Sequence, residues 1–83
     1  MGYNRYSSDN NYRECLKELK REAKELGLST TGFRVHTDSQ GEVTVSNGRF
    51  ESSTYEGVTA ARCEVIQQMI DDEHNANSLF EIY

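Results

Sequence analysis

The chain has 83 residues, a mass of 9.5 kDa and a net charge of −5, with nine Lys and Arg against fourteen Asp and Glu. This length allows one domain with a thin core, because a domain of this size buries only about 60% of the surface that its unfolded chain exposes. The sequence has no apolar run near the ~18 residues of a membrane span, no signal peptide and only two cysteines, so we expect a cytoplasmic protein without a disulfide scaffold.

The N-terminal third predicts a flexible arm followed by an amphipathic helix. Residues 1–11 are rich in Asn, Ser and Tyr and show no helical or strand periodicity, which predicts a mobile or partner-ordered arm. Apolar residues then recur at spacings of four and three, as they do along one side of a helix. These residues are Tyr12, Leu16, Leu19, Ala23 and Leu26. Asp9 or Asn10 could cap this helix, and Gly27 could end it in a left-handed conformation.

The middle of the chain predicts an antiparallel meander. Residues 33–36 and 42–45 alternate apolar with polar side chains, and the segment 38–41 between them begins with Asp and ends with Gly, as type I turns do. Asn47-Gly48 is a strong hairpin signal, because both residues tolerate a positive φ. A two-residue loop there pairs Ser46 with Arg49, Val45 with Phe50 and Thr44 with Glu51. This register places Val45 and Phe50 on the same face as Phe33 and Val35.

The same register predicts two rows of side chains on the open face of the sheet. One row is His36–Thr44–Glu51 and the next is Arg34–Ser46–Arg49. Two neighbouring arginines could bind a carboxylate or phosphate through paired hydrogen bonds. The ordinary alternative is a solvated sheet face, which is common in antiparallel sheets.

A second helix is predicted from Ser53 to about Glu73, because residues 53–56 form a capping box. Its apolar residues cover about half of the circumference, so the first helix or a partner must cover what the sheet leaves exposed. They are Val58, Ala61, Cys63, Val65, Ile66, Met69 and Ile70. Residues 78–83 are β-like and could add a short fourth strand or dock elsewhere as a tail.

These elements predict an α+β fold, a two-layer sandwich of order α-β-β-β-α. Both helices would cover one face of a three-stranded antiparallel meander. The single domain would span residues 12–73, preceded by the arm 1–11 and followed by 74–83 as a tail or added strand.

The layout over residues 12–70 resembles that of the double-stranded RNA-binding domain. That family holds phosphates with a lysine cluster at the start of its second helix, whereas residues 54–59 here contain one Glu and no Lys. This departure argues against duplex RNA as the ligand. In size, charge and architecture the chain also resembles the small anti-CRISPR and related anti-defence proteins of phages, which implies a protein-binding inhibitor in the host cytoplasm.

Charge is unevenly distributed, with seven basic and five acidic residues in 1–37 but two basic and nine acidic residues in 38–83. We therefore expect a protein-binding module, an inhibitor or adaptor, whose acidic surface meets a basic partner surface that normally holds nucleic acid. The acidic surface would comprise Glu42, Glu51, Glu56, Glu64, Asp71, Asp72 and Glu73. Candidate anchors outside the periodic pattern are Tyr3, Tyr6, Phe80 and Tyr83. Arg62 lies inside the apolar arc, where it either covers the core with its methylenes or anchors a contact.

Direct nucleic-acid binding is the alternative. It would use a basic stripe on the first helix together with two arginines of the sheet, namely Arg13, Lys17, Lys20, Lys24, Arg34 and Arg49. An adjoining acidic stripe of Glu14, Glu18, Glu22 and Glu25 favours a solvated, salt-bridged helix instead. We expect a monomer or a homodimer, the latter sealed by the apolar arc or by residues 79–83.

No metal, cofactor or enzymatic activity is expected. The segment Asp71–His74 has the spacing of neither a calcium loop nor a zinc site, and Cys15, Cys63, His36 and His74 include no C-x-x-C pair. The two cysteines lie on or beside apolar helical faces, where a thiol is usually inert. The sequence also lacks a nucleophilic Ser elbow and a Gly-rich phosphate loop.

Overall fold

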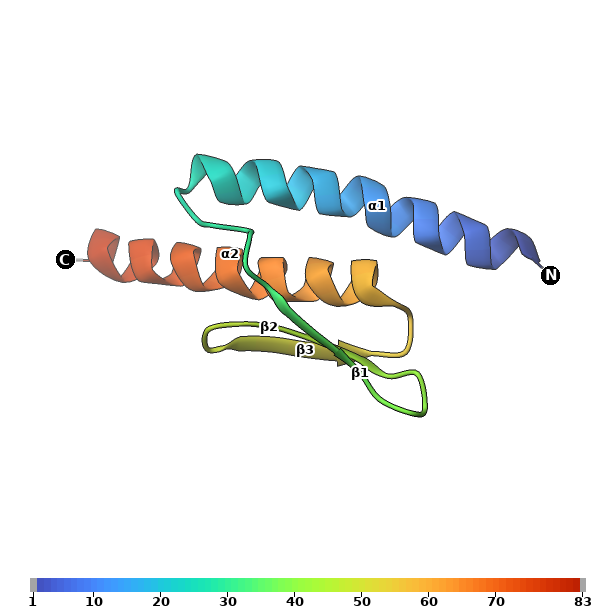
Figure 1. Ribbon diagram of the computed structural model, residues 1–83. Coiled ribbons are helices and arrows are strands. Elements are labelled where there is room, and N and C mark those ends of the chain that lie inside the picture. The colour runs from blue at the N-terminus through green and yellow to red at the C-terminus, as the bar shows by residue number, and fades with distance from the viewer. Residues whose placement is uncertain (1, 83) are drawn as a thin grey trace.

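The computed structural model describes the backbone of residues 2–82 and the side chains of residues 11–76. Its elements are α1 (Gly2–Glu25), β1 (Arg34–Thr37), β2 (Val43–Asn47), β3 (Phe50–Thr54) and α2 (Val58–Ile82) (Figure 1). The three strands form one antiparallel sheet in the order β1-β2-β3. The predicted α+β class and the order α-β-β-β-α are therefore confirmed.

Helix α1 begins at Gly2, ten residues before the predicted start at Tyr12. The capping role predicted for Asp9 or Asn10 is wrong, because both residues lie inside the helix. No Gly or Pro interrupts residues 3–26, so the helix continues through a segment without an apolar stripe. Whether residues 1–11 move as an independent arm stays a prediction.

The C-terminus of α1 is closed as predicted, by Gly27 with a φ of +79°. The amide of Gly27 donates to the carbonyl of Lys24 at 3.0 Å, and the amide of Leu28 donates to that of Ala23 at 2.8 Å. This pair of bonds is the Schellman motif, which satisfies two of the last carbonyls of a helix. It also turns Leu28 back toward the core.

Helix α2 begins at Val58 and not at Ser53, so the predicted capping box is wrong. Residues 50–54 belong to strand β3, in which the Ser53 hydroxyl lies 2.7 Å from that of Thr44 on β2. Gly57, with a φ of +108°, then links the strand to the helix. The expected strand at 78–83 is also wrong as far as Ile82, because no Gly or Pro follows Gly57 and α2 continues to that residue. Tyr83 lies outside the described residues.

The register between β1 and β2 is as predicted, with Arg34 opposite Ser46 and His36 opposite Thr44. Between β2 and β3 the predicted pairing is wrong by two residues, because Asn47 pairs with Phe50 and the loop is Gly48-Arg49.

The backbone of the loop explains this shift. A type I′ turn at Asn47-Gly48 needs a positive φ at both residues, but among the described residues only glycines have one. A type II′ turn needs it only at the first central residue, which Gly48 supplies with a φ of +63°. Phe50 still shares a face with Val45, because side chains alternate with a period of two.

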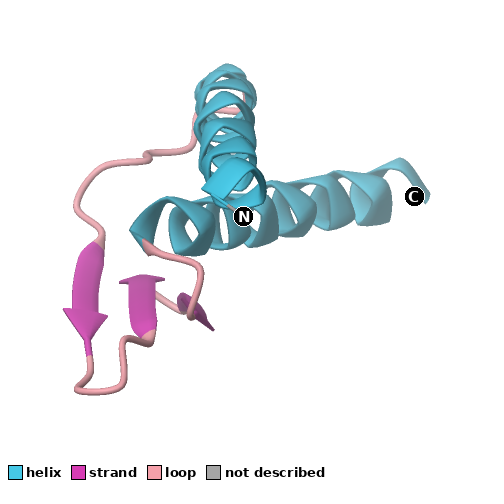
Figure 2. Cartoon of the chain, turned by 90° about the vertical axis from the view of Figure 1, so that its right-hand side faces the viewer, coloured by secondary structure: helices cyan, strands magenta, loops and turns pink. Residues whose placement is uncertain are grey.

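Helix α2 forms the central layer of the fold. Figures 1 and 2 show α1 packed on the side of α2 that faces away from the sheet, so both helices lie on one side of the sheet but only α2 covers it. One core cluster, between α1 and α2, contains Leu19, Ala23, Cys63, Ile66 and Ile70. A second, between α2 and the sheet, contains Val43, Val45, Ala61, Val65 and Met69. Leu28 and Phe33 contact both clusters.

The expectation that the first helix must cover part of the wide apolar arc is thus confirmed, and the arc requires no second copy of the chain. Val35 on β1 faces the same side as Val45 but remains 46% exposed. Strand β1 lies at the sheet edge, and α2 makes its extensive contacts with β2 and β3 only. The sandwich is therefore three layers deep over β2 and β3 and open over β1.

Ile66 tests the interface between α1 and α2, because it is fully buried there. We expect Ile66→Ala to lower the free energy of unfolding by about 2–5 kcal/mol, through lost apolar burial and the cavity left behind. Gln67→Ala, on the exposed side of the same turn, should change it by less than about 0.5 kcal/mol. Urea denaturation followed by circular dichroism measures both. Equal stability of the two variants would contradict the central position of α2.

Candidate functional site

The seven carboxylates predicted to form one acidic surface lie on different parts of the molecule. Asp72 forms an ion pair with Arg49 at the tip of the β2–β3 hairpin. Glu51 lies on the open face of the sheet, Glu42 precedes β2, and Glu73 is half-buried on α2. These four residues do not share a face with the remaining three, and their role in partner binding stays a prediction.

The remaining three are Glu56, Glu64 and Asp71, all of them exposed. On α2, Glu64, Gln67 and Asp71 follow at spacings of three and four, which places them on one side of the helix. The Gln67 amide donates to the Asp71 carboxylate at 3.0 Å. This side is turned away from both core clusters, so its charges are free to meet a partner.

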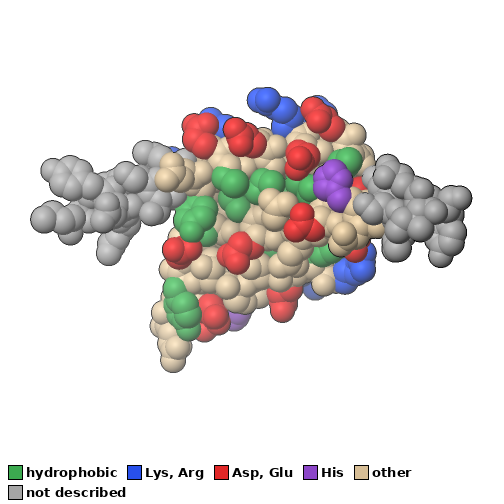
Figure 3. All heavy atoms as spheres, turned by 180° about the vertical axis from the view of Figure 1, so that it is seen from behind, with side chains coloured by type: hydrophobic (Ala, Val, Ile, Leu, Met, Phe, Trp, Pro, Cys, Tyr) green, Lys and Arg blue, Asp and Glu red, His purple; other side chains and the backbone are tan. Residues whose placement is uncertain are grey.

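Helix α1 adds a second set of carboxylates to the same side of the molecule. Its exposed acidic residues recur at spacings of four and three and are Glu14, Glu18, Glu22 and Glu25. Figure 3 shows acidic side chains gathered over both helices, with apolar side chains in the band between them and basic ones along the edge formed by α1. We call this region the acidic face, made of the α1 set together with Glu56, Glu64 and Asp71.

Tyr12 lies where the two sets meet. Its hydroxyl donates a 2.5 Å hydrogen bond to the Glu56 carboxylate, and its backbone carbonyl accepts one from the Cys63 thiol at 3.3 Å. The pKa of Tyr12 is raised, first by the hydrogen bond to Glu56, then by desolvation, and then by the negative charges of Glu56 and Glu64. Both carboxylates therefore lie close enough to Tyr12 to oppose the ionisation of its phenol.

The acidic stripe of α1 had a sequence signal, namely its spacing of four and three. From sequence alone these glutamates were expected to pair with neighbouring Lys and Arg of the same helix. Only the packing of α1 on α2 brings them to the same side as Glu64. Sequence reasoning therefore placed the negative surface in the second half of the chain and missed four of its seven members.

Of the predicted anchors, only Arg62 falls within the described side chains; those of Tyr3, Tyr6, Phe80 and Tyr83 lie outside them. Arg62 is half-buried on α2. Its Nε is buried and makes no hydrogen bond within the described part of the chain. Whether Arg62 covers the core with its methylenes or anchors an interface stays a prediction.

The predicted row of two arginines on the open sheet face is wrong. The observed register gives the row Arg34–Ser46–Glu51, with a carboxylate where Arg49 was expected. Arg49 instead lies in the hairpin loop, where it pairs with Asp72 and its guanidinium lies 4.8 Å from the centre of the Phe50 ring. The four residues predicted to form a basic stripe on α1, which are Arg13, Lys17, Lys20 and Lys24, are all exposed.

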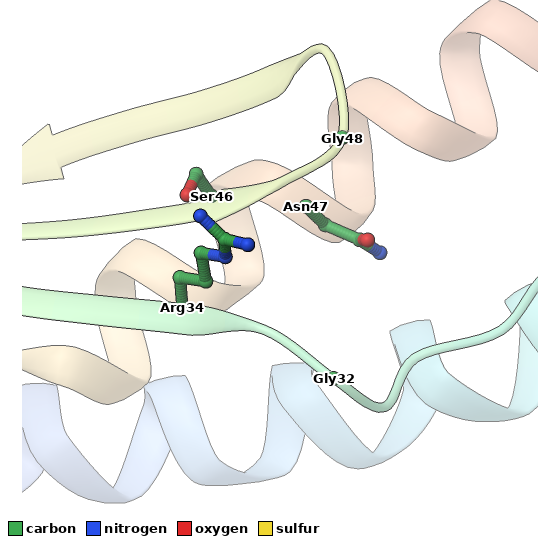
Figure 4. A pocket seen from close by; sticks show the side chains of 5 residues that line it. All are labelled: Gly32, Arg34, Ser46, Asn47 and Gly48. Atoms are coloured by element: carbon green, nitrogen blue, oxygen red, sulfur yellow. The ribbon is translucent and has the colours of Figure 1, made fainter.

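Arg34 also lines a polar cavity of about 330 Å³ at the hairpin end of the sheet (Figure 4). The other lining residues are Gly32, Ser46, Asn47 and Gly48. The Asn47 amide donates to the sulfur of Met69 at 3.6 Å. Arg34 is the one charged residue among the described residues that line this cavity. One exposed cation does not provide the paired grip that was expected of two.

Comparison with protein-family models, curated proteins and solved structures finds no significant match to this chain. Within residues 11–76, no three His, Cys, Asp or Glu side chains are grouped so that they could bind a metal ion. None of the helical segments that the structure describes has the length and apolar character of a membrane span. The acidic face is therefore the candidate site that the geometry supports best.

The ionisation of Tyr12 tests the potential of the acidic face. We expect Glu56→Gln to lower the pKa of Tyr12 toward the ordinary tyrosine value of about 10, because the variant removes both the charge and the carboxylate acceptor. Glu42→Gln serves as the control, since that carboxylate is not among the groups acting on Tyr12. NMR titration of a tyrosine-labelled sample measures the value. An unchanged pKa in Glu56→Gln would rule out the observed hydrogen bond as its cause.

Proposed function

We propose that the protein is a non-enzymatic inhibitor or adaptor of the cytoplasm that binds a basic, nucleic-acid-handling surface of a partner protein through its acidic face. The observation that carries this proposal is the convergence of carboxylates from α1, α2 and the β3–α2 connection on one side of the molecule (Figure 3). The raised pKa of Tyr12 at their meeting point supports a negative potential there.

The arrangement suits a surface that competes with phosphates. Carboxylates four residues apart on a helix are separated by a rise of about 6 Å, so α1 presents a regular series of negative charges on a rigid support. A partner surface lined with Lys and Arg would meet these charges where it otherwise meets a nucleic-acid backbone. Complementary charge mainly accelerates association, while apolar contacts in the band between the helices would slow release.

Four members of the predicted acidic surface lie outside the acidic face and should contribute less to partner binding. They are Glu42, Glu51, Asp72 and Glu73. Asp72 already has an arginine partner, and an exposed ion pair of this kind contributes at most about 1 kcal/mol to stability. Glu51 lies on another face of the sheet, and Glu42 lies beside the β1–β2 turn. This difference in position allows a test in which total charge is held equal.

The test measures the affinity of two double charge-reversal variants of this chain for a partner protein. The partner is first captured from the native host with the wild-type chain and identified by mass spectrometry. Glu64→Lys/Asp71→Lys alters the acidic face, and Glu42→Lys/Glu51→Lys makes the same change in net charge elsewhere. We expect the first variant to weaken binding by about tenfold or more and to flatten its salt dependence. The control should remain close to the wild type. Equal losses in both variants, or wild-type affinity independent of salt, would overturn the proposal.

A mobility-shift assay with duplex DNA and single-stranded RNA at low salt tests the alternative. We expect no shift, because Arg34 and Arg49 do not meet on the sheet and the basic side of α1 adjoins its acidic stripe. A shift that Lys17→Glu/Lys24→Glu abolishes would instead establish nucleic-acid binding through α1, and the acidic face would then lose its proposed role.

A further inference from the structure

The two cysteines of the chain come from different helices and meet at the seam between α1 and α2. Cys63 on α2 is 6% exposed and belongs to the cluster that joins the two helices. Its thiol donates to the backbone carbonyl of Tyr12 at 3.3 Å. The sulfur of one helix therefore touches the main chain of the other.

Cys15 lies on the same part of α1. It follows Tyr12 by three residues and precedes Leu19 by four, and residues at these spacings occupy one side of a helix. Both neighbours pack against the α1–α2 cluster. Burial, the largest cause, raises the pKa of the Cys63 thiol to about 11, and the neighbouring Cys15 thiol adds to the shift.

The two thiols differ in access to solvent. Cys15 is exposed and Cys63 is buried. A disulfide requires Cα atoms within about 7 Å of each other, and the Cys63 sulfur contacts the α1 main chain at Tyr12, one turn from Cys15. An exposed thiol beside a buried one is the arrangement in which the first sulfur is oxidised and the second resolves it.

We propose that Cys15 and Cys63 form a reversible oxidative modification site, which closes as a disulfide between α1 and α2 under peroxide. The Cys15 thiolate attacks a peroxide oxygen, the O–O bond breaks, and Cys15 becomes a sulfenic acid while water leaves. The Cys63 thiol then loses its proton as its sulfur attacks the Cys15 sulfur, the S–OH bond breaks, and the hydroxyl leaves as water with the Cys63 proton. Two electrons pass from the sulfurs to hydrogen peroxide, and a dithiol reductant reverses the step.

This site goes beyond the proposed function and does not depend on it. The disulfide would join residues 48 positions apart, and cross-links that close loops of this length strongly restrict the unfolded chain. It would also fix α1 on α2 beside Tyr12, where the two sets of carboxylates meet. Oxidation would thus make the acidic face rigid without altering its charge.

The experiment uses the full chain, reduced and then exposed to hydrogen peroxide. We expect a monomeric product that has lost two hydrogen atoms by mass spectrometry, with a linked peptide containing Cys15 and Cys63. Its melting temperature should rise by about 10 °C or more and return on addition of dithiothreitol. Neither Cys15→Ser nor Cys63→Ala should show this product or this shift.

Three results would overturn the proposal. One is that both thiols stay open to alkylation after treatment. Another is that Cys15 accumulates as a sulfinic acid without any linkage to Cys63. The third is that disulfide-linked dimers through Cys15 are the main product, which would show that the exposed thiol meets a second chain before it meets Cys63. Because Cys15 is exposed, we expect Cys15→Ser to fold normally. A missing disulfide in this variant is then due to the absent thiol and not to unfolding.

Discussion

The burial of α2 on two opposite sides is the constraint on which the rest of the structure depends. The sheet covers Val65 and its neighbours on one side of α2, and α1 covers Ile66 and its neighbours on the other. An 83-residue chain has little apolar surface to bury, so one helix shared between two clusters is an economical core. Leu28 and Phe33, in the connection between α1 and β1, contact both clusters and join them into one unit.

The same constraint positions the candidate site. With two sides of α2 buried, its exposed carboxylates, Glu64 and Asp71, lie on the side that is turned away from both clusters. Packing of α1 on α2 fixes which side of α1 is hidden, and the acidic stripe of α1 then falls beside those residues (Figure 3). The seam between the helices, occupied by Tyr12 and the two cysteines, is thus both part of the core and the border of the acidic face.

Carboxylates that are adjacent in the second half of the sequence lie on different sides of the folded molecule. Asp72 is adjacent to Asp71 in sequence, but one helical step of about 100° turns it toward the hairpin, where it pairs with Arg49. That pairing depends in turn on the turn type at Gly48, because the observed register leaves Arg49 in the loop instead of on β3. A local backbone preference therefore decides which carboxylate remains unpaired.

The sequence by itself determined the α+β class, the element order, the Gly27 helix stop, the β1–β2 register and the need for a second cover on α2. These follow from periodicity and turn chemistry, which act over a few residues. Only the tertiary structure decided how far α1 extends at its N-terminus and α2 at its C-terminus, the position of the hairpin loop, and the proximity of Cys15 and Cys63. It also decided which carboxylates share a face, because the rotation of one helix against another depends on packing between residues far apart in the chain.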